Sequence, residues 1–140
     1  MSTRIHVISS MATKQLLADL AALYQQARPD TDIHVESVGG VDAAKRVQAG
    51  EVFDIVALAA NAIDTLTQAG RVVAGTRADL VHSGVAVAVP AAAPLPSIGN
   101  EAEVRAAVLA APTLGYSTGP SGVALAKLFE RWGIAETIRN

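Results

Sequence analysis

The stretch Ile5-His6-Val7-Ile8-Ser9-Ser10 decides the fold, because an apolar run stops there at small polar residues and an amphipathic run follows at once. The same change recurs after residues 33–38 and after residues 114–116. A strand that ends in a small-residue loop and opens a helix directs free backbone N–H groups and the positive end of the helix dipole at one spot. Repeated junctions of this kind predict a protein that holds a small anionic solute.

Working outward from this stretch, strands alternate with helices through the first part of the chain. The predicted strands are residues 4–9, 32–38 and 53–58, and the helices after them are expected to end near Ala27, Ala49 and Ala69. Gly50 and Gly70 are placed to stop the second and third helices. This alternation predicts the α/β class, with a parallel sheet that has helices on both faces.

The rhythm changes after the third helix. Residues 79–82 and 84–89 predict a long extended segment that Ser83 and Gly84 interrupt, and an Ala/Pro-rich stretch follows it. We expect a first lobe over residues 1–83, a crossover strand and linker over 84–96, and part of a second lobe over 97–140. The second lobe is predicted to contain a helix over 101–111, a short strand over 113–116 and a last amphipathic helix that ends at Gly133.

Composition excludes several classes of protein. The chain has 140 residues, of which 51% are hydrophobic and 17% charged, with a formal net charge of −2. Its scattered Lys and Arg residues give no electrostatic footprint for nucleic acid. Without cysteine, and with histidines at 6, 34 and 82 that form no i, i+4 helical pair, we expect no metal site and no cofactor.

The order of parts resembles the type II periplasmic solute-binding proteins, in particular their molybdate-binding branch. The resemblance is carried by residues 5–10, residues 47–55, residues 83–90 and the Gly119-Pro120-Ser121-Gly122 stretch, which opens a helix. It implies a two-lobed protein that holds an oxyanion or a carboxylate between its lobes and delivers it to the membrane component of an ABC transporter. It also implies a periplasmic location, with a cytoplasmic one as the alternative because no signal peptide precedes the first strand.

Two departures from that resemblance concern the solute and the length of the chain. In the molybdate-binding branch two serine hydroxyls hold the oxyanion, and the matching positions are Ala12 and Gly40 here. We therefore expect a site built mostly from backbone N–H groups, for an anion that need not be molybdate. The chain also stops inside the expected second lobe, so it is either a fragment or completed in another way, and an incomplete lobe favours self-association.

The candidate ligand-binding residues lie at the strand-to-helix junctions, and each has a structural alternative. Ser9, Ser10 and Asn61 can instead cap helices, and Gly39 and Gly40 can instead form a tight turn. Ser83 can line the cleft or end a strand, and the loop around Gly119 and Ser121 lacks the Gly-Lys-Ser/Thr ending of a nucleotide site. The full candidate set is Ser9, Ser10, Gly39, Gly40, Asn61, Ser83, Gly119 and Ser121.

An enzyme is the main alternative to a binding protein, and no residue is assigned a catalytic role. One branch that resembles this family isomerises aconitate, which requires a base beside a carboxylate clamp. His82, Asp54 and Asp42 are the candidates for that base, although the pattern around Asp54 favours a structural carboxylate that accepts backbone N–H bonds. A regulatory ligand-sensing domain on the same fold is a third hypothesis.

Overall fold

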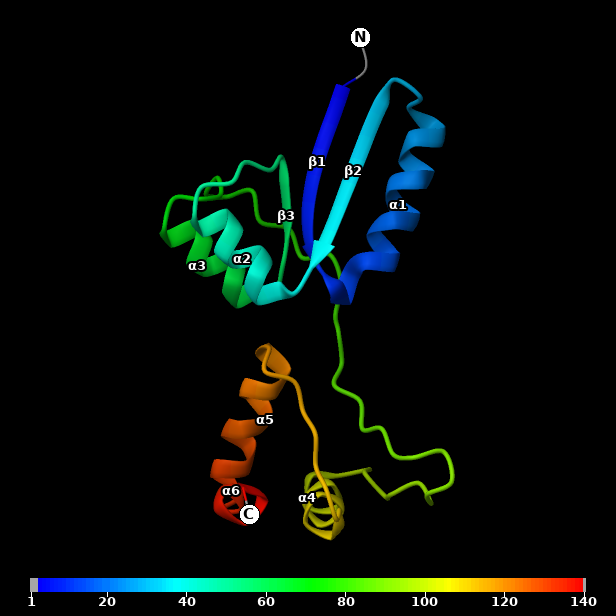
Figure 1. Cartoon of the computed structure of the whole chain (residues 1–140), viewed down its shortest axis with the longest axis vertical. Helices are drawn as coiled ribbons and strands as arrows, with labels where there is room; N and C mark the ends of the chain where they lie inside the picture. The colour runs from blue at the N-terminus through cyan, green and yellow to red at the C-terminus, as the bar shows by residue number, and fades with distance from the viewer. Residues whose placement is uncertain (1–2, 140) are drawn as a thin grey trace. The chain divides into compact units, whose positions relative to one another are not determined.

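The computed structural model describes residues 3–139 and divides into two compact units, Met1–Leu80 and Val81–Asn140 (Figure 1). The first unit contains a three-stranded sheet of order β2-β1-β3, built from β1 (Thr3–Ser10), β2 (Thr31–Val38) and β3 (Ile55–Ala57). Both neighbours of β1 run parallel to it. The α/β class and the parallel sheet are therefore confirmed.

The helices of the first unit follow the strands in the predicted alternation. A short 3-10 helix, η1 (Met11–Thr13), leads from β1 into α1 (Lys14–Ala27), while α2 (Gly40–Gln48) follows β2 and α3 (Ala60–Gln68) follows β3. α1 packs against β2, whereas α2 contacts both β1 and α3. Gly50 and Gly70 end α2 and α3 with φ values of 96° and 66°, which glycine adopts without the strain of a Cβ atom.

The hydrophobic core of the first unit lies between the sheet and the helices α2 and α3. Its buried residues are Ile8 of β1, Ala43 and Val47 of α2, and Leu66 of α3. Because side chains alternate across a strand, Val7 and Ser9 point to the opposite face of the sheet, and both are also buried. The first unit is thus a sheet with buried side chains on both faces of its central strand.

Helix α1 differs from the amphipathic helix that its sequence predicts. None of its residues is fully buried, and the apolar side chains expected on its inner face are largely exposed. Within the described residues, the exposed members of that stripe are Leu16, Leu20, Leu23 and Tyr24. α1 therefore carries an uncovered apolar surface.

The second unit contains α4 (Glu101–Ala110), α5 (Pro120–Arg131) and α6 (Ala135–Arg139). Phe129 and Ile134 are buried, and the Phe129 ring contacts Tyr116 edge-on at 5.7 Å and lies 6.1 Å from the Trp132 ring. Glu101 joins α4 to α5, because its carboxylate accepts hydrogen bonds from the Arg131 guanidinium and from the Trp132 Nε1–H. Gly133 ends the α5 segment with a φ of 68°, as predicted.

Several predicted elements are absent or shorter in the described residues. Residues 84–89 and 113–116 form no strand, and the predicted strand over 53–58 is reduced to Ile55–Ala57. A strand persists only where a neighbour accepts its backbone hydrogen bonds, and no described segment pairs with 84–89 or 113–116. The predicted crossover strand and the short strand of the second lobe are therefore wrong.

Candidate functional site

The carboxyl edge of the sheet brings the first junctions together. β1 and β2 are in register from Thr3 opposite Thr31 to Ser10 opposite Val38, so the loops that leave both strands start side by side. α2 begins directly after β2 and η1 directly after β1. In parallel α/β sheets, ligands bind in the crevice outside the carboxyl ends of the strands. This edge is the candidate site in the first unit.

Ser10 and the start of α2 are adjacent at this edge. A Cβ atom placed on Gly40 would lie 3.4 Å from the Cβ of Ser10. The first backbone hydrogen bond of α2 runs from Ala43 N–H to the Gly39 carbonyl, so the N–H groups of residues 40–42 precede the helical ladder. Ser10 is the N-cap residue of η1, yet its side chain makes no capping hydrogen bond. Together they present a hydroxyl and helix N-terminal amides at one place.

Ser9 is placed differently from Ser10. Its side chain is fully buried, and its Oγ lies 2.8 Å from the Oγ of Ser37, its partner in the β1–β2 register. This hydrogen bond joins two strands inside the sheet. Ser9 therefore supports the sheet, and the polar side chain that β1 presents at the edge is Ser10.

A carboxylate already lies at the N-terminus of α2. A Cβ on Gly39 would sit 3.2 Å from Oδ2 of Asp42, a first-turn residue. Negative charge in the first turn of a helix is stabilised by the helix dipole. An anionic solute at Gly39 and Gly40 would therefore meet both attractive amides and a repelling aspartate.

The alternative role of Asn61 as a helix N-cap is wrong. α3 begins at Ala60 with Ala59 as its N-cap, and the backbone N–H groups of Ala62 and Ile63 both bond to the Ala59 carbonyl. Asn61 is instead an exposed residue of the first turn whose carbonyl accepts a hydrogen bond from Thr65. Because α3 follows the carboxyl end of β3, Asn61 still lies on the same edge of the sheet as Ser10.

The remaining candidates belong to the second unit. Ser83 is exposed in a segment without secondary structure, Gly119 is the N-cap of α5, and the Ser121 Oγ lies 2.8 Å from the Ser117 Oγ. A Cβ on Gly122 would lie 1.5 Å from the Ser117 carbonyl oxygen, so this turn requires glycine. A shallow depression of about 350 Å³ runs along α5, lined by Val85, Ser121, Ala124, Leu125, Lys127, Leu128 and Arg131.

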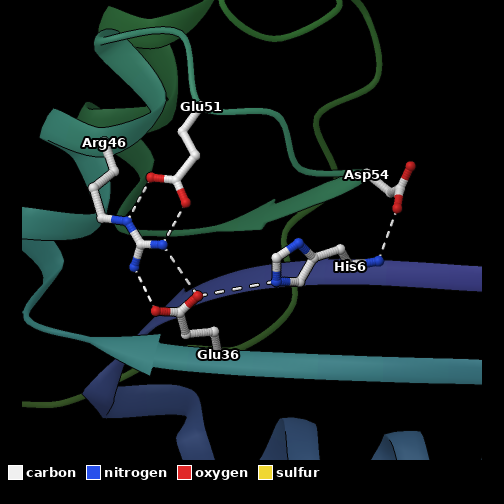
Figure 2. Close-up of polar contacts among 5 residues, drawn as sticks. All are labelled: His6, Glu36, Arg46, Glu51 and Asp54. Atoms are coloured by element: carbon white, nitrogen blue, oxygen red, sulfur yellow. Dashed lines mark hydrogen bonds and ion pairs between the residues drawn. The ribbon is translucent and has the colours of Figure 1, made fainter.

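A polar cluster around Arg46 lies outside the residues that the sequence predicts for the site. Figure 2 shows the Arg46 guanidinium between the carboxylates of Glu36 and Glu51, with hydrogen bonds to both. The Arg46 guanidinium also lies 5.4 Å from the centre of the Phe53 ring. Hydrogen bonds from Arg46 lower the pKa of Glu36 and of Glu51 below the ordinary glutamate value. This cluster fastens the end of α2 to β2 and to the loop before β3.

Asp54 has a structural role in the described residues. Its Oδ2 accepts the backbone N–H of His6 at 2.7 Å (Figure 2). Its own N–H donates to the His6 carbonyl at 2.9 Å. These bonds fix the start of β3 against β1. The interpretation of Asp54 as an acceptor of backbone N–H bonds is thus confirmed.

His6 and His34 lie side by side, which their separation along the chain concealed. They are direct partners in the β1–β2 register, with ring centroids 5.2 Å apart. The His6 Nε2 is also 3.9 Å from Glu36 Oε2, and the His6 ring contacts the Phe53 ring at 4.9 Å. His82 lies in the other unit.

Comparison with known proteins identifies a protein family and a relative. Residues 5–140 match the family of bacterial extracellular solute-binding proteins. An aconitate isomerase from a Pseudomonas species is 29% identical over 133 residues, which make up 90% of this chain and 50% of that protein. The chain thus spans about half the length of the curated relative that it matches. Among the described residues, no helix is long and apolar enough to cross a membrane.

Proposed function

Because the chain belongs to the bacterial extracellular solute-binding protein family, we propose that it binds a small anion at the carboxyl edge of β1 and β2. The observation that carries the proposal is the adjacency of Ser10 to the N-terminus of α2, where Gly40 leaves the backbone open. Helix N-terminal amides and a free hydroxyl donate hydrogen bonds, which suit an oxyanion or a carboxylate.

Within that class we favour an organic carboxylate over molybdate. Ala12 and Gly40 stand where the molybdate-binding branch has serines, so two hydroxyl donors are missing. The relative named aconitate isomerase points to a carboxylate solute as well. The Asp42 carboxylate beside Gly39 adds repulsion that grows with the charge density of the ligand.

We further propose that the solute is delivered to the membrane component of an ABC transporter from a periplasmic location, as the family resemblance implies. The exposed apolar face of α1 supports the proposal that chains self-associate, since contiguous apolar surface is often an interaction site. Contributions from Ser83, Gly119 and Ser121 to the solute site are part of the same proposal.

A thermal-shift titration of the chain tests the proposal with molybdate, tungstate, sulfate, phosphate, citrate and both aconitate isomers. A ligand that binds only the folded state stabilises it by about 2.7 kcal/mol at 100 times its Kd. We expect the largest rise in melting temperature with a carboxylate, abolished in Gly40→Asp and increased in Asp42→Asn. Asp64→Asn, on an exposed residue of α3 that pairs with Arg77, is the control, and its rise in melting temperature with ligand should match that of wild type.

Three results would contradict the proposal. Binding that survives Gly40→Asp would remove the start of α2 from the site, and a rise with molybdate alone would reverse the preference for carboxylates. If none of these anions stabilises the wild-type chain, anion binding by the first unit fails.

The second candidate function is aconitate isomerisation, favoured by the similarity to the aconitate isomerase. Of the proposed bases, Asp54 is engaged by the His6 amide, whereas Asp42 lies at the candidate edge. Incubation with one aconitate isomer, followed by chromatography of both, tests it. Conversion that is lost in Asp42→Asn and kept in Asp64→Asn would support an enzyme, and no conversion by wild type would reject it.

A further inference from the structure

The open part of the sheet face that carries α2 holds a pair of histidines outside the solute site. His6 and His34 occupy directly opposed positions on β1 and β2 and therefore project from the same face. The His6 side chain is 38% exposed, and His34 is exposed as well. Both imidazoles can thus be reached by a solute ion.

The spacing of the two rings suits a shared metal ion. With metal–nitrogen bonds of about 2.0–2.1 Å and each ring centre about 1.1 Å beyond its nitrogen, two imidazoles on one tetrahedral ion have centroids about 5 Å apart. The observed separation is 5.2 Å, and the planes are tilted by 43°. The register of β1 and β2 therefore already holds the two rings at the separation that a shared ion requires.

The charges around the pair also favour a cation. Arg46 is bonded to both Glu36 and Glu51, so this cluster holds two carboxylates against one guanidinium. Glu36 Oε2 lies 3.9 Å from His6 Nε2, and Asp32, two residues before His34 on the same face of β2, is paired with Arg4. These groups together supply three carboxylates and two guanidinium groups. An added cation therefore meets a net negative surrounding.

We propose that His6 and His34 form a two-histidine binding site for a divalent transition metal ion that prefers imidazole, such as Cu²⁺, Ni²⁺ or Zn²⁺. No group of three or more His, Asp or Glu side chains is arranged to hold a metal in the described part of the chain, so the remaining ligands are water or a solute. Imidazole ligands select these ions over Mg²⁺ and Ca²⁺, which require oxygen. The bound ion would staple β1 to β2.

Titration calorimetry of the full chain with Cu²⁺ tests this site, and pulsed electron paramagnetic resonance counts the coordinated imidazoles. His34→Ala is the main variant because His34 is exposed. His82→Ala, at the chain's remaining histidine, is the matched control. Circular dichroism of each variant establishes that the fold is kept.

We expect wild type and His82→Ala to bind one Cu²⁺ with the signature of two imidazoles, and Mg²⁺ not to compete. Loss of outer-shell partners already weakens metal binding by about 10–100-fold, so removal of a direct ligand in His34→Ala should cost at least about tenfold. Equal Cu²⁺ affinity in wild type and folded His34→Ala, or a signal without two imidazoles in wild type, would overturn the proposal.

Discussion

The two compact units have similar sequence patterns, but different interactions stabilise the inside of each unit. In the first, β1 is hydrogen-bonded to a strand on each side, and Ile8 packs against α2 and α3. In the second, none of the described residues forms a strand. Phe129 packs against Tyr116 and Trp132, and hydrogen bonds to Glu101 join α5 to α4. The difference shows that an apolar segment becomes a strand only when another strand is available to pair with it.

The second unit should be the easier of the two to break, through Phe129. This side chain is 3% exposed and contacts the rings of Tyr116 and Trp132. Replacement of a buried Phe by Ala costs about 3–5 kcal/mol, and the second unit has few other buried side chains to compensate. We expect Phe129→Ala to unfold the second unit at a much lower urea concentration, while amide exchange in β1 stays slow.

Fluorescence of Trp132, the single tryptophan, reports on the second unit alone. Val123→Ala is the control on the same helix, because Val123 is 53% exposed. Its unfolding midpoint should match wild type. Equal loss of protection in β1 and α5 on Phe129→Ala would mean that the two units unfold together, which would remove the contrast between them.

The first unit should lose somewhat less from Leu66→Ala. Leu66 is 2% exposed in the core of Ile8, Ala43 and Val47, and such a truncation costs about 2–5 kcal/mol. The paired strands should keep the backbone in place, so we expect a lower melting temperature by circular dichroism with unchanged far-ultraviolet spectra. Val73→Ala, at a residue of the first unit that is 73% exposed, should change stability by less than about 0.5 kcal/mol. A comparable cost for both variants would show that burial in this core does not decide the stability of the first unit.

The secondary structure of the first unit was more predictable from sequence than that of the second, because a strand forms only where another strand pairs with it. The strands and helix ends of residues 4–50 follow from apolar runs, small-residue loops and Gly50, which are local signals. The alternating residues Val85, Val87 and Val89 have the pattern of a strand as well. Whether they form one depends on a partner strand, which no local signal reveals.

The candidate site was predictable in part. The positions of Ser10, Gly39 and Gly40 at strand-to-helix junctions were predicted because a strand end followed by a helix is visible in sequence. The burial of Ser9 against Ser37 and the contact of His6 with His34 depend on the register of strands 28 residues apart, which the sequence does not encode locally. The Arg46 cluster was missed because its members come from a strand, a helix and a loop.

The smallest expected effect is a loss of stability in acid. The two units differ in the groups that donate hydrogen bonds to their carboxylates. Arg46 lowers the pKa of Glu36 and Glu51 in the first unit, while the Trp132 N–H and then Arg131 lower the pKa of Glu101 in the second. A carboxyl with a lowered pKa in the folded state stabilises the fold above its unfolded pKa, near 4.5. That stabilisation is lost as the pH falls through the folded pKa values, so both units should weaken below about pH 4.5.

Urea unfolding at pH 7 and at about pH 3.5 measures this loss in each unit, by amide exchange in β2 and by Trp132 fluorescence. Arg46→Gln should flatten the acid dependence of the first unit only, because the guanidinium is the main cause of both pKa shifts there. Lys45 is the neighbouring cation on α2 and makes no ion pair among the described residues. Lys45→Gln should therefore leave the acid dependence of the first unit unchanged. If Arg46→Gln and Lys45→Gln flatten the profile equally, the effect comes from the net charge of α2, and the bonds to Glu36 and Glu51 contribute nothing specific to stability in acid.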